Sequence, residues 1–404
     1  MSKRSSIALG TILKNFSRVA AHPWVASRLV ALEKEKFLFN MLNPRADQGR
    51  ARSIRQVSVR ITDVCNLRCH TCGQWGDQGF LHCADLKDLK KAEVSPERYH
   101  LLLGDLASHG HFPSVYLWGG EPTLYKGWLE IIEHATALRM PTSIATNATG
   151  IAKAAERLVA APMFLLQMSI DGPDPDTHNA ARPKASGGDN FADVIEALGA
   201  VNEAKRAMGR KLPLTASLTT ISQANFHRLV DIYETFKDKV DIFVFYLSWW
   251  IDEASATAHD QDFARRFGFT PKLHRGWVGD WTIKDHATLN AQLTEVLARS
   301  KSLSSPAVNI IPNITGVDNL REYYTNHGAT YGYDQCISIF QAVEIDSNGD
   351  MSPCRDYHDY VVGNVKDQTI TEVWNNEAYR KFRGSLHREG LMPACTRCCG
   401  LMGY

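Results

Sequence analysis

Features that mark several other classes of protein are missing from this sequence of 404 residues. No apolar run approaches the roughly 18 to 20 residues that span a bilayer, and the N-terminus lacks the basic, apolar and small-residue order of a secretory signal. Cysteine is scarce, with nine in the chain and none between Cys83 and Cys336. We therefore expect a cytoplasmic globular protein in a reducing compartment, where clustered cysteines are more often metal ligands than disulfides.

Negative charge is nearly absent from the first 60 residues. They contain twelve Lys and Arg but three acids, the first being Glu33, so this segment carries +9 in a chain of formal charge +1. Apolar residues recur at helical spacing on both sides of His22-Pro23, which predicts two basic amphipathic helices. Three interpretations stay open: packing against the body of the protein or a partner subunit, contact of residues 1–45 with an anionic membrane surface, and an organellar transit peptide. No nucleic-acid partner is expected, because no recognisable binding module accompanies the charge.

Short apolar runs alternate with amphipathic stretches from residue 54 onward. The runs predict strands at residues 57–62, 114–118, 142–146, 164–170, 214–220 and 241–247. The stretches between them predict helices near residues 95–108, 127–138, 151–160, 190–208 and 224–237. This alternation indicates an α/β fold with a parallel sheet, a partial (β/α)6 TIM-like barrel whose functional groups lie at the C-terminal ends of the strands.

Three of the nine cysteines stand together in "CNLRCHTC", residues 65–72, directly after the first predicted strand. Thiolates spaced as Cys65, Cys69 and Cys72 can bind three corners of a cubane iron–sulfur cluster and leave the fourth iron open to a substrate or cofactor. A structural zinc site is the alternative, with a fourth ligand from His70, His82 or Cys83.

This loop resembles that of the radical S-adenosylmethionine (radical SAM) enzymes, and three further motifs agree, each after its own predicted strand. "WGGEPTL" at residues 118–124 is similar to the family's Gly-Gly-Glu-Pro motif, "ATN" ends the third strand, and "MSIDG" ends the fourth. The resemblance implies that SAM is bound by Gly119, Gly120, Glu121, Pro122, Asn147, Ser169, Asp171 and Arg182.

The same resemblance implies roles for these residues. The Gly-Gly-Glu-Pro motif holds the methionine amino group, since glycines admit a close backbone approach and a carboxylate suits an ammonium. Ser169 and Asp171 lie near the ribose, and Arg182 clamps the carboxylate of SAM. One position departs from the family pattern: Thr71 stands where an aromatic residue is common, so contact with the adenine is expected from Trp75 or from elsewhere.

The chemistry that the resemblance implies is reductive cleavage of SAM at a 4Fe–4S cluster. One electron, from a donor such as flavodoxin or ferredoxin, yields methionine and a 5′-deoxyadenosyl radical, which abstracts a hydrogen atom from an unreactive carbon. The protein's task is to orient the substrate and exclude quenchers, and no general base is assigned among its side chains.

Five more cysteines lie near the C-terminus. "CISIFQAVEIDSNGDMSPC", residues 336–354, predicts a strand and a turn between two cysteines. With the later "CTRCC" it resembles the SPASM and twitch domains, which carry auxiliary iron–sulfur clusters. Four thiolates suffice for one cluster, so one auxiliary 4Fe–4S cluster for electron transfer is predicted, and a zinc site is the alternative. The expected ligands are Cys336, Cys354, Cys395 and Cys398, with Cys399 as the alternative to Cys398.

The expected organisation is a basic helical extension (1–53), a radical SAM partial barrel (54–285), a helical connection (286–335) and a twitch/SPASM-like domain (336–404). Aromatic residues are dense at 246–286 and are candidates for a pocket lining, although about half are expected to be ordinary packing. The resemblance implies an oxidoreductase acting on a small-molecule, sugar-like or lipid-linked substrate. Two alternatives stay open: a maturase that modifies a ribosomally made peptide and, more remotely, a non-catalytic iron–sulfur electron carrier.

Overall fold

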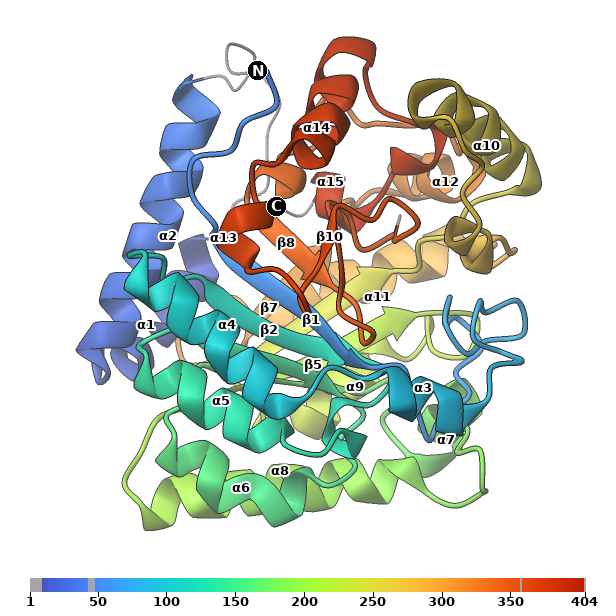
Figure 1. The fold of residues 1–404 in the computed structure, drawn as a ribbon. Coiled ribbons are helices and arrows are strands. Elements are labelled where there is room, and N and C mark those ends of the chain that lie inside the picture. Colours follow the sequence, from blue (N-terminus) through green and yellow to red (C-terminus); the bar gives the residue numbers. More distant parts are fainter. Residues whose placement is uncertain (1–8, 43–47, 357, 403–404) are drawn as a thin grey trace.

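The sheet is the framework on which every candidate site residue is placed. The computed structural model describes residues 9–42, 48–356 and 358–402, and their strands form one ten-stranded sheet in the order β10-β9-β8-β1-β2-β3-β4-β5-β6-β7 (Figure 1). Strands β1 to β7 are parallel and adjacent in chain order, as expected for β/α units. Their bounds are Gln56–Thr62 (β1), Ser114–Gly119 (β2), Thr142–Thr146 (β3), Leu165–Ser169 (β4), Leu214–Ile221 (β5), Ile242–Leu247 (β6) and Ala307–Ile311 (β7).

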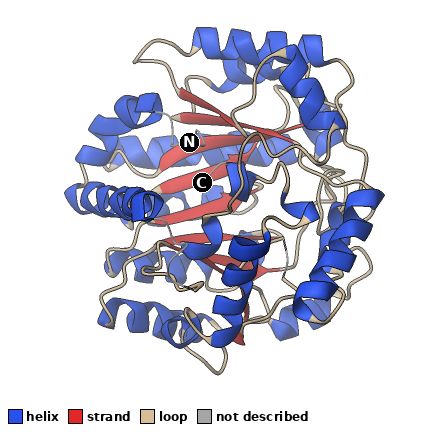
Figure 2. Cartoon of the chain, turned by 90° about the horizontal axis from the view of Figure 1, so that it is seen from above, coloured by secondary structure: helices blue, strands red, loops and turns tan. Residues whose placement is uncertain are grey.

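Helices cover the outer face of the curved sheet (Figure 2). Side chains cap the N-termini of several of them, as Ser95 caps α4 and Asp189 caps α8, which fixes the residue at which each helix begins. The helices of the barrel region are α3 (Leu86–Ala92), α4 (Pro96–Ser108), α5 (Trp128–Ala137), α6 (Ile151–Ala160), α7 (Pro175–Ala181), α8 (Asn190–Ala207), α9 (Leu229–Phe236), α10 (Glu253–Phe267), α11 (His286–Arg299) and α12 (Val317–Thr325).

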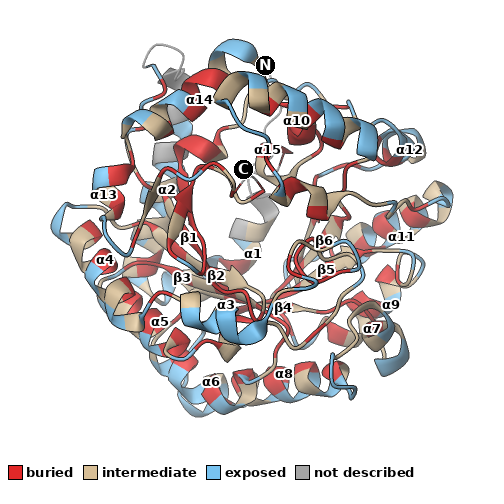
Figure 3. Ribbon diagram, turned by 45° about the vertical axis from the view of Figure 1, so that its right-hand side comes forward, coloured by how far each residue is buried: buried red, intermediate tan, exposed pale blue. Residues whose placement is uncertain are grey.

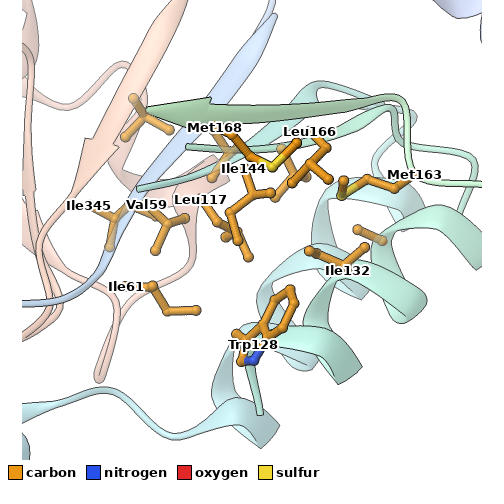
Figure 4. Close-up of a cluster of buried hydrophobic side chains, with 14 of the residues drawn as sticks. Val59, Ile61, Leu117, Trp128, Ile132, Ile144, Met163, Leu166, Met168 and Ile345 are labelled. Carbon is orange, nitrogen blue, oxygen red and sulfur yellow. The ribbon is translucent and has the colours of Figure 1, made fainter. Parts of the chain in front are cut away.

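The hydrophobic core lies between the sheet and this helical layer (Figure 4). Ile144 on β3 and Leu166 on β4 are fully buried there, and Ile132 on α5 packs from the helical side. Exposed residues lie mainly on the outer helices and buried ones on the strands (Figure 3). Burial of apolar area at roughly 25 cal/mol per Å2 is the main stabilisation of such a layered fold.

The six predicted strands are β1 to β6, and the structure adds a seventh. Residues 286–335, expected to be a helical connection, contain α11 and α12 and, between them, β7, which pairs with β6. The sequence of β7, "AVNII", lies between Pro306 and Pro312 and contains the polar residue Asn309. Its apolar run is therefore too short to predict a strand.

The C-terminal segment extends the same sheet. Strand β8 (Ala342–Ile345) pairs in parallel with β1, and β9 (Asp350–Ser352) and β10 (Gly363–Asn364) follow it in antiparallel pairs. The predicted turn before β9 is present, with Gly349 in the left-handed region at φ +94°. Helices α13 (Ile370–Val373), α14 (Glu377–Glu389) and α15 (Cys399–Met402) complete this segment. The cysteine-rich C-terminal segment is therefore joined to the barrel through β1.

Helices α1 (Leu9–Ala20) and α2 (Pro23–Leu42) pack against the N-terminal ends of the strands. Arg18 forms an ion pair with Asp241 at 3.1 Å, and Lys14 donates to backbone carbonyls of the loop before β7. Val25 is buried among the first residues of β5, β6 and β7. Of the three interpretations left open for these helices, packing against the body accounts for these contacts; residues 1–8 and 43–47 lie outside the described residues.

Within the described ranges, no helix is both long enough and apolar enough to span a bilayer.

Candidate active site between two cysteine groups

The first cysteine group lies on the loop after β1, and each sulfur accepts a hydrogen bond. The backbone N–H of Leu67 donates to Cys65 at 3.4 Å, and that of Trp75 donates to Cys72 at the same distance. The third sulfur, Cys69, lies 3.7 Å from an Arg182 guanidinium nitrogen. Donors aimed at sulfur stabilise thiolates and tune iron–sulfur clusters, so this loop fits a three-cysteine cluster site.

The protonation of these thiols also fits a cluster. Burial raises the pKa of Cys65 to about 12 and that of Cys69 to about 11, and repulsion from neighbouring thiolates adds to the effect. Cys65 and Cys69 are therefore held as thiols when no iron is bound, and binding of iron must displace their protons. No three His, Cys, Asp or Glu side chains of the described chain are arranged to share one metal ion, whereas in a cubane each cysteine binds a separate iron.

The two glycines of "WGGEPTL" are required by backbone packing. A Cβ on Gly119 would lie 2.3 Å from the carbonyl oxygen of Thr62, and one on Gly120 would lie 2.3 Å from that of Val64. Gly119 also has φ +143°. These glycines bring the end of β2 against the start of the cysteine loop, which is a packing reason that the sequence alone did not supply. Their expected role in admitting a ligand stays a prediction.

Glu121 is fully buried and joins β2 to β3. Its carboxylate accepts hydrogen bonds from Thr123, from the hydroxyl of Thr146 at 2.6 Å and from the backbone N–H of Asn147 at 2.7 Å. Burial raises the pKa of Glu121, and these donors partly oppose the shift. Its side chain therefore organises two strand ends; its expected contribution to holding the SAM amino group stays a prediction.

Asp171 and Arg182 meet beside the cysteine loop. The Nε of Arg182 donates to Asp171 at 2.6 Å, and the other carboxylate oxygen of Asp171 accepts from the backbone N–H of Thr220 at 2.8 Å. The same guanidinium reaches Cys69, so the structure brings together a cluster cysteine and two of the residues expected to bind SAM. Such a charged pair can orient a carboxylate and a hydroxyl group of one ligand.

Two buried residues behind this pair were not identified from the sequence. His178 Nδ1 accepts from the backbone N–H of Asp171 at 3.2 Å, and its Nε2 lies 3.1 Å from the Asn190 side-chain oxygen. Asn190 in turn donates to the carbonyl of Asn147 at 2.9 Å. Burial lowers the pKa of His178, which keeps the imidazole neutral and able to accept. Only their proximity in the fold reveals this network, because no short motif contains them.

The remaining sequence-predicted residues divide between the site and the scaffold. Asn147 donates to Asn66 of the cysteine loop at 2.8 Å. Ser169 is the last residue of β4 and is half-buried. Pro122 begins the short turn after β2 and is buried. Trp75, considered for adenine contact, is buried with its Nε1 donating to the Asp63 carbonyl at 2.7 Å, so its ring edge serves the loop itself.

The second cysteine group surrounds a cavity of about 310 Å3 inside the barrel. Inward-facing strand residues such as Gln56, Tyr116 and Gln167 form one side of it. The other side carries all five C-terminal cysteines, Cys336, Cys354, Cys395, Cys398 and Cys399.

The pKa of Cys399 is shifted in the opposite direction from that of Cys336, Cys354 and Cys398. Burial raises the pKa of Cys336 and that of Cys354, and a hydrogen bond with Cys399, then burial, raises the pKa of Cys398. That same hydrogen bond, helped by the charge of Arg355, lowers the pKa of Cys399. A buried group of thiols in one cavity fits an auxiliary cluster, in which positive iron offsets the charge of the thiolates.

A second cavity, of about 270 Å3, lies between the first cysteine loop and two of the C-terminal cysteines. Thr71 and Gln74 of the first loop line it on one side, and Cys398 and Cys399 line it on the other. Its walls include Arg60, Trp118, Trp249, Trp277, Arg355 and His358. Five residues line both cavities, namely Tyr246, Arg355, Asp356, Cys398 and Cys399. A molecule in the second cavity is thus placed between the two groups.

The aromatic stretch at 246–286 is divided as expected between cavity and core. Trp249 and Trp277 line the second cavity with ring centroids 5.5 Å apart. Trp250 and Phe263 are buried in the core, and Phe263 packs edge-on against Tyr360 of the C-terminal segment. Helix α10 therefore supports the C-terminal segment instead of lining the cavity.

Arg397, within "CTRCC", fixes the C-terminal cysteines to the barrel and was not identified from the sequence. It is fully buried, at φ +59°, and donates to the carbonyls of Tyr323 at 2.8 Å and Trp250 at 2.7 Å. From the sequence alone, a charged side chain between cysteines would be expected to be exposed to solvent. Arg397 is buried because backbone carbonyls of distant elements accept its hydrogen bonds.

Two family models match the chain. One, described as the radical SAM superfamily, matches residues 59–234, and the other, described as an iron–sulfur cluster-binding domain (SPASM), matches residues 336–399. The AdoMet-dependent heme synthase of Methanosarcina barkeri is 23% identical over 352 residues, which cover 84% of this chain and 88% of that protein.

Further similarities concern a maturation protein and a protein solved with a bound precursor peptide. The sporulation killing factor maturation protein SkfB of Bacillus subtilis is 26% identical over 178 residues, which cover 45% of this chain and 38% of that protein. The structure of Streptococcus suis SuiB bound to precursor peptide SuiA shares the fold, with a TM-score of 0.56 and 15% identity over 89% of this chain and 70% of SuiB.

Proposed function

Because the chain belongs to the radical SAM superfamily and carries a C-terminal iron–sulfur cluster-binding domain, we propose that it oxidises a small substrate held between its two cysteine groups. The protein is an enzyme whose cofactors are SAM and 4Fe–4S clusters. The proposal concerns its substrate and the use of its second group. One observation carries it: the 270 Å3 cavity has the first cysteine loop on one side and Cys398 and Cys399 on the other.

The residues of the first group bind and orient SAM in this proposal. Cys65, Cys69 and Cys72 hold a cluster with one open iron. Arg182 and Asp171, paired at 2.6 Å beside Cys69, orient the carboxylate and the ribose. When bound there, cluster and SAM supply a radical that removes a hydrogen atom from an unreactive carbon.

The walls of the cavity position the substrate and exclude water. Trp118 is fixed by a hydrogen bond from its Nε1 to Ser58 at 2.9 Å, and Trp249 by one to the Thr396 carbonyl at 2.9 Å. Rigid indole faces suit a ring, which favours a sugar-like or other small cyclic substrate, free or linked to a lipid. Fixed walls also hold the reacting carbon in one geometry and keep solvent from quenching a radical.

The second group serves electron transfer in this proposal. Cys336, Cys354, Cys395 and Cys398 hold one auxiliary 4Fe–4S cluster with no open iron, which leaves no site for a substrate ligand. The 310 Å3 cavity that they line shares a wall with the substrate cavity, so an electron has a short path between the two.

Reconstitution tests the proposal. Anaerobically reconstituted protein is expected to bind about eight irons and eight sulfides per chain and to form 5′-deoxyadenosine from SAM and dithionite. Perdeuterated substrate pools are then offered, and transfer of deuterium into 5′-deoxyadenosine identifies the pool that contains the substrate. About four irons with cleavage would remove the auxiliary cluster from the mechanism, and zinc without cleavage would overturn the proposal.

A peptide maturase is the second candidate, favoured by the similarity to SkfB. The same deuterium experiment separates the two. A deuterated sugar or metabolite pool is expected to label 5′-deoxyadenosine, and labelling from a deuterated peptide pool alone would replace the first candidate with the second.

Two partners complete the proposal. Flavodoxin or ferredoxin reduces the first cluster, which predicts that either protein replaces dithionite in the cleavage assay. The N-terminal helices contact the inner face of a membrane through apolar side chains that the fold leaves exposed, among them Phe16 and Phe37. A variant with Phe16→Ser and Phe37→Ser is expected to lose cosedimentation with anionic vesicles; equal binding of the native protein to neutral vesicles, or none at all, would refute that contact.

A further inference from the structure

We infer that Arg355 raises the reduction potential of the auxiliary cluster and so prepares it to take an electron from the substrate cavity. The inference rests on the proposed function, because it assumes that a cluster occupies the C-terminal cysteine group. In this inference the Arg355 guanidinium acts on the cluster through its positive charge. No covalent bond to Arg355 forms or breaks.

Arg355 stands at the wall between the two cavities. It directly follows Cys354 in the chain, and it lines both the 310 Å3 cavity of the cysteines and the 270 Å3 cavity beside it. Its guanidinium carbon lies 5.9 Å from the ring centroid of Tyr116 and 5.6 Å from that of Trp118. These aromatic faces hold a planar cation in place and leave its donors at the edge.

The charge of Arg355 is incompletely neutralised by side chains. Its one ion pair with the residues that the structure describes joins Nη2 to Glu344 at 3.3 Å, a long distance for a charge-assisted hydrogen bond. By contrast Arg60, the other arginine of the cavity wall, pairs with Asp63 at 3.0 Å and with Asp346 at 3.1 Å. Among the five described residues shared by the two cavities, Arg355 is the one cation and Asp356 the one carboxylate.

A cation at this position favours the reduced state of the auxiliary cluster. A cluster held by four thiolates carries net negative charge, which grows by one when the cluster accepts an electron. In a site screened from water that added charge is costly, and it is made more costly by the buried carboxylates of Glu344 and of Asp356, whose Oδ2 lies 3.4 Å from the Cys398 sulfur. Arg355 offsets this cost, so its removal makes the cluster a poorer electron acceptor.

The step served by this charge is a two-electron oxidation of the substrate. A C–H bond breaks and its hydrogen atom goes to the 5′ carbon derived from SAM. The remaining carbon radical gives one electron to the auxiliary cluster, which is reduced, and the adjacent heteroatom gives its proton to a base in the cavity, where the His358 imidazole lies against Asp346 at 2.6 Å. A carbon–heteroatom double bond forms.

Redox titration followed by EPR tests the inference without the substrate. The titration uses the full chain carrying Cys69→Ala, reconstituted with iron and sulfide, so that the auxiliary cluster alone contributes a signal. Arg355→Gln is expected to disfavour reduction at least tenfold, which is a shift of about 59 mV to more negative potential for one electron. Arg355→Lys is expected to retain most of the potential, because it keeps the charge.

Two further variants protect the test against misfolding. Glu344→Gln removes a negative charge from the same wall and is expected to shift the potential in the opposite, positive direction. Arg157→Gln, on the outer helix α6, is the control and is expected to change nothing. An unchanged potential in Arg355→Gln at full cluster content overturns the inference, as does a shift of the same sign in Arg355→Gln and Glu344→Gln. If Arg355→Gln does not hold the cluster, an unshifted Glu344→Gln overturns it.

Failure of the proposed function has a different outcome. If the native chain cleaves SAM while binding only about four irons, the electron-transfer role of the C-terminal group is wrong and Arg355 has no cluster on which to act.

Discussion

The two cysteine groups are built in opposite ways. The first occupies eight consecutive residues after β1, and its sulfurs accept hydrogen bonds from backbone N–H groups of the same loop, those of Leu67 and Trp75. The second draws cysteines from positions 336 to 399 and gathers them through β8, β9 and the C-terminal turns. A local loop can leave one corner of a cluster open, whereas a group assembled from several segments can enclose a cluster. The difference in construction matches the proposed difference in role.

The charges around the two groups differ as well. Arg182 pairs closely with Asp171 at 2.6 Å and reaches Cys69. At the second group Arg355 lies near the rings of Tyr116 and Trp118, with Glu344 and Asp356 close by. The first arrangement is suited to clamping a polar ligand, and the second to balancing the charge of a cluster.

Cys69→Ala is the largest test of this contrast. Loss of one of three ligands is expected to remove the first cluster, lower iron from about eight to about four per chain and abolish formation of 5′-deoxyadenosine. Iron analysis and a chromatographic assay measure both quantities. Loss of all iron would mean that the two groups do not load independently.

Cys354→Ala is the corresponding test of the second cysteine group. It is expected to remove the auxiliary cluster, again leaving about four irons, while cleavage of SAM continues and turnover of an identified substrate is suppressed. Wild-type turnover in this variant would refute electron transfer through the second group.

Arg397→Met tests whether the second group depends on distant contacts. The variant leaves the carbonyls of Tyr323 and Trp250 without their buried donor, at a cost of about 3 kcal/mol. Thermal unfolding of the cluster-free protein is expected to occur at lower temperature. In the reconstituted variant, heating is expected to release the auxiliary iron before the iron of the first group. Arg321→Met, at an exposed arginine of α12, is the matched control. Equal melting temperatures for the two variants would contradict the anchoring role.

Low pH is expected to reduce the stability of the folded state through His178, which lies behind the first cysteine group. Because burial lowers its pKa in the folded state, the unfolded chain takes up a proton first as pH falls below about 6.5. The folded state therefore loses stability with falling pH, by at most about 1.4 kcal/mol per unit from this residue, until the lowered pKa is reached. His178→Gln is expected to reduce that slope in thermal melts between pH 7 and pH 5, and an unchanged slope would show that His178 does not contribute.

Cys399→Ser is expected to have the smallest effect. With Cys398 as the fourth ligand, the variant retains about eight irons and its auxiliary EPR signal, whereas Cys398→Ser loses that signal. The reverse pattern would make Cys399 the ligand and would exchange the two neighbouring residues in the proposed site.

The fold could be predicted from the sequence because the patterns that indicate strands and helices are local. The alternation of apolar runs with amphipathic stretches located β1 to β6 and five helices of the barrel, and α6 and β3 have the predicted bounds. It missed β7, whose five residues include a polar Asn309, and it did not predict that β8 pairs with β1. Pairing between segments almost 300 residues apart depends on unsatisfied strand edges, which leave no trace in a short window.

The sequence by itself determined the first cysteine group, the motifs at the ends of the strands and the division into a barrel and a cysteine-rich C-terminal segment, because spacing along the chain carries that information. Only the tertiary structure decided that Gly119 and Gly120 serve backbone packing, that Arg397 is buried, and that Arg355 stands between the two cavities. These depend on backbone atoms and charges supplied by distant elements. Their distances are set by the packing of the whole sheet, which no local spacing encodes.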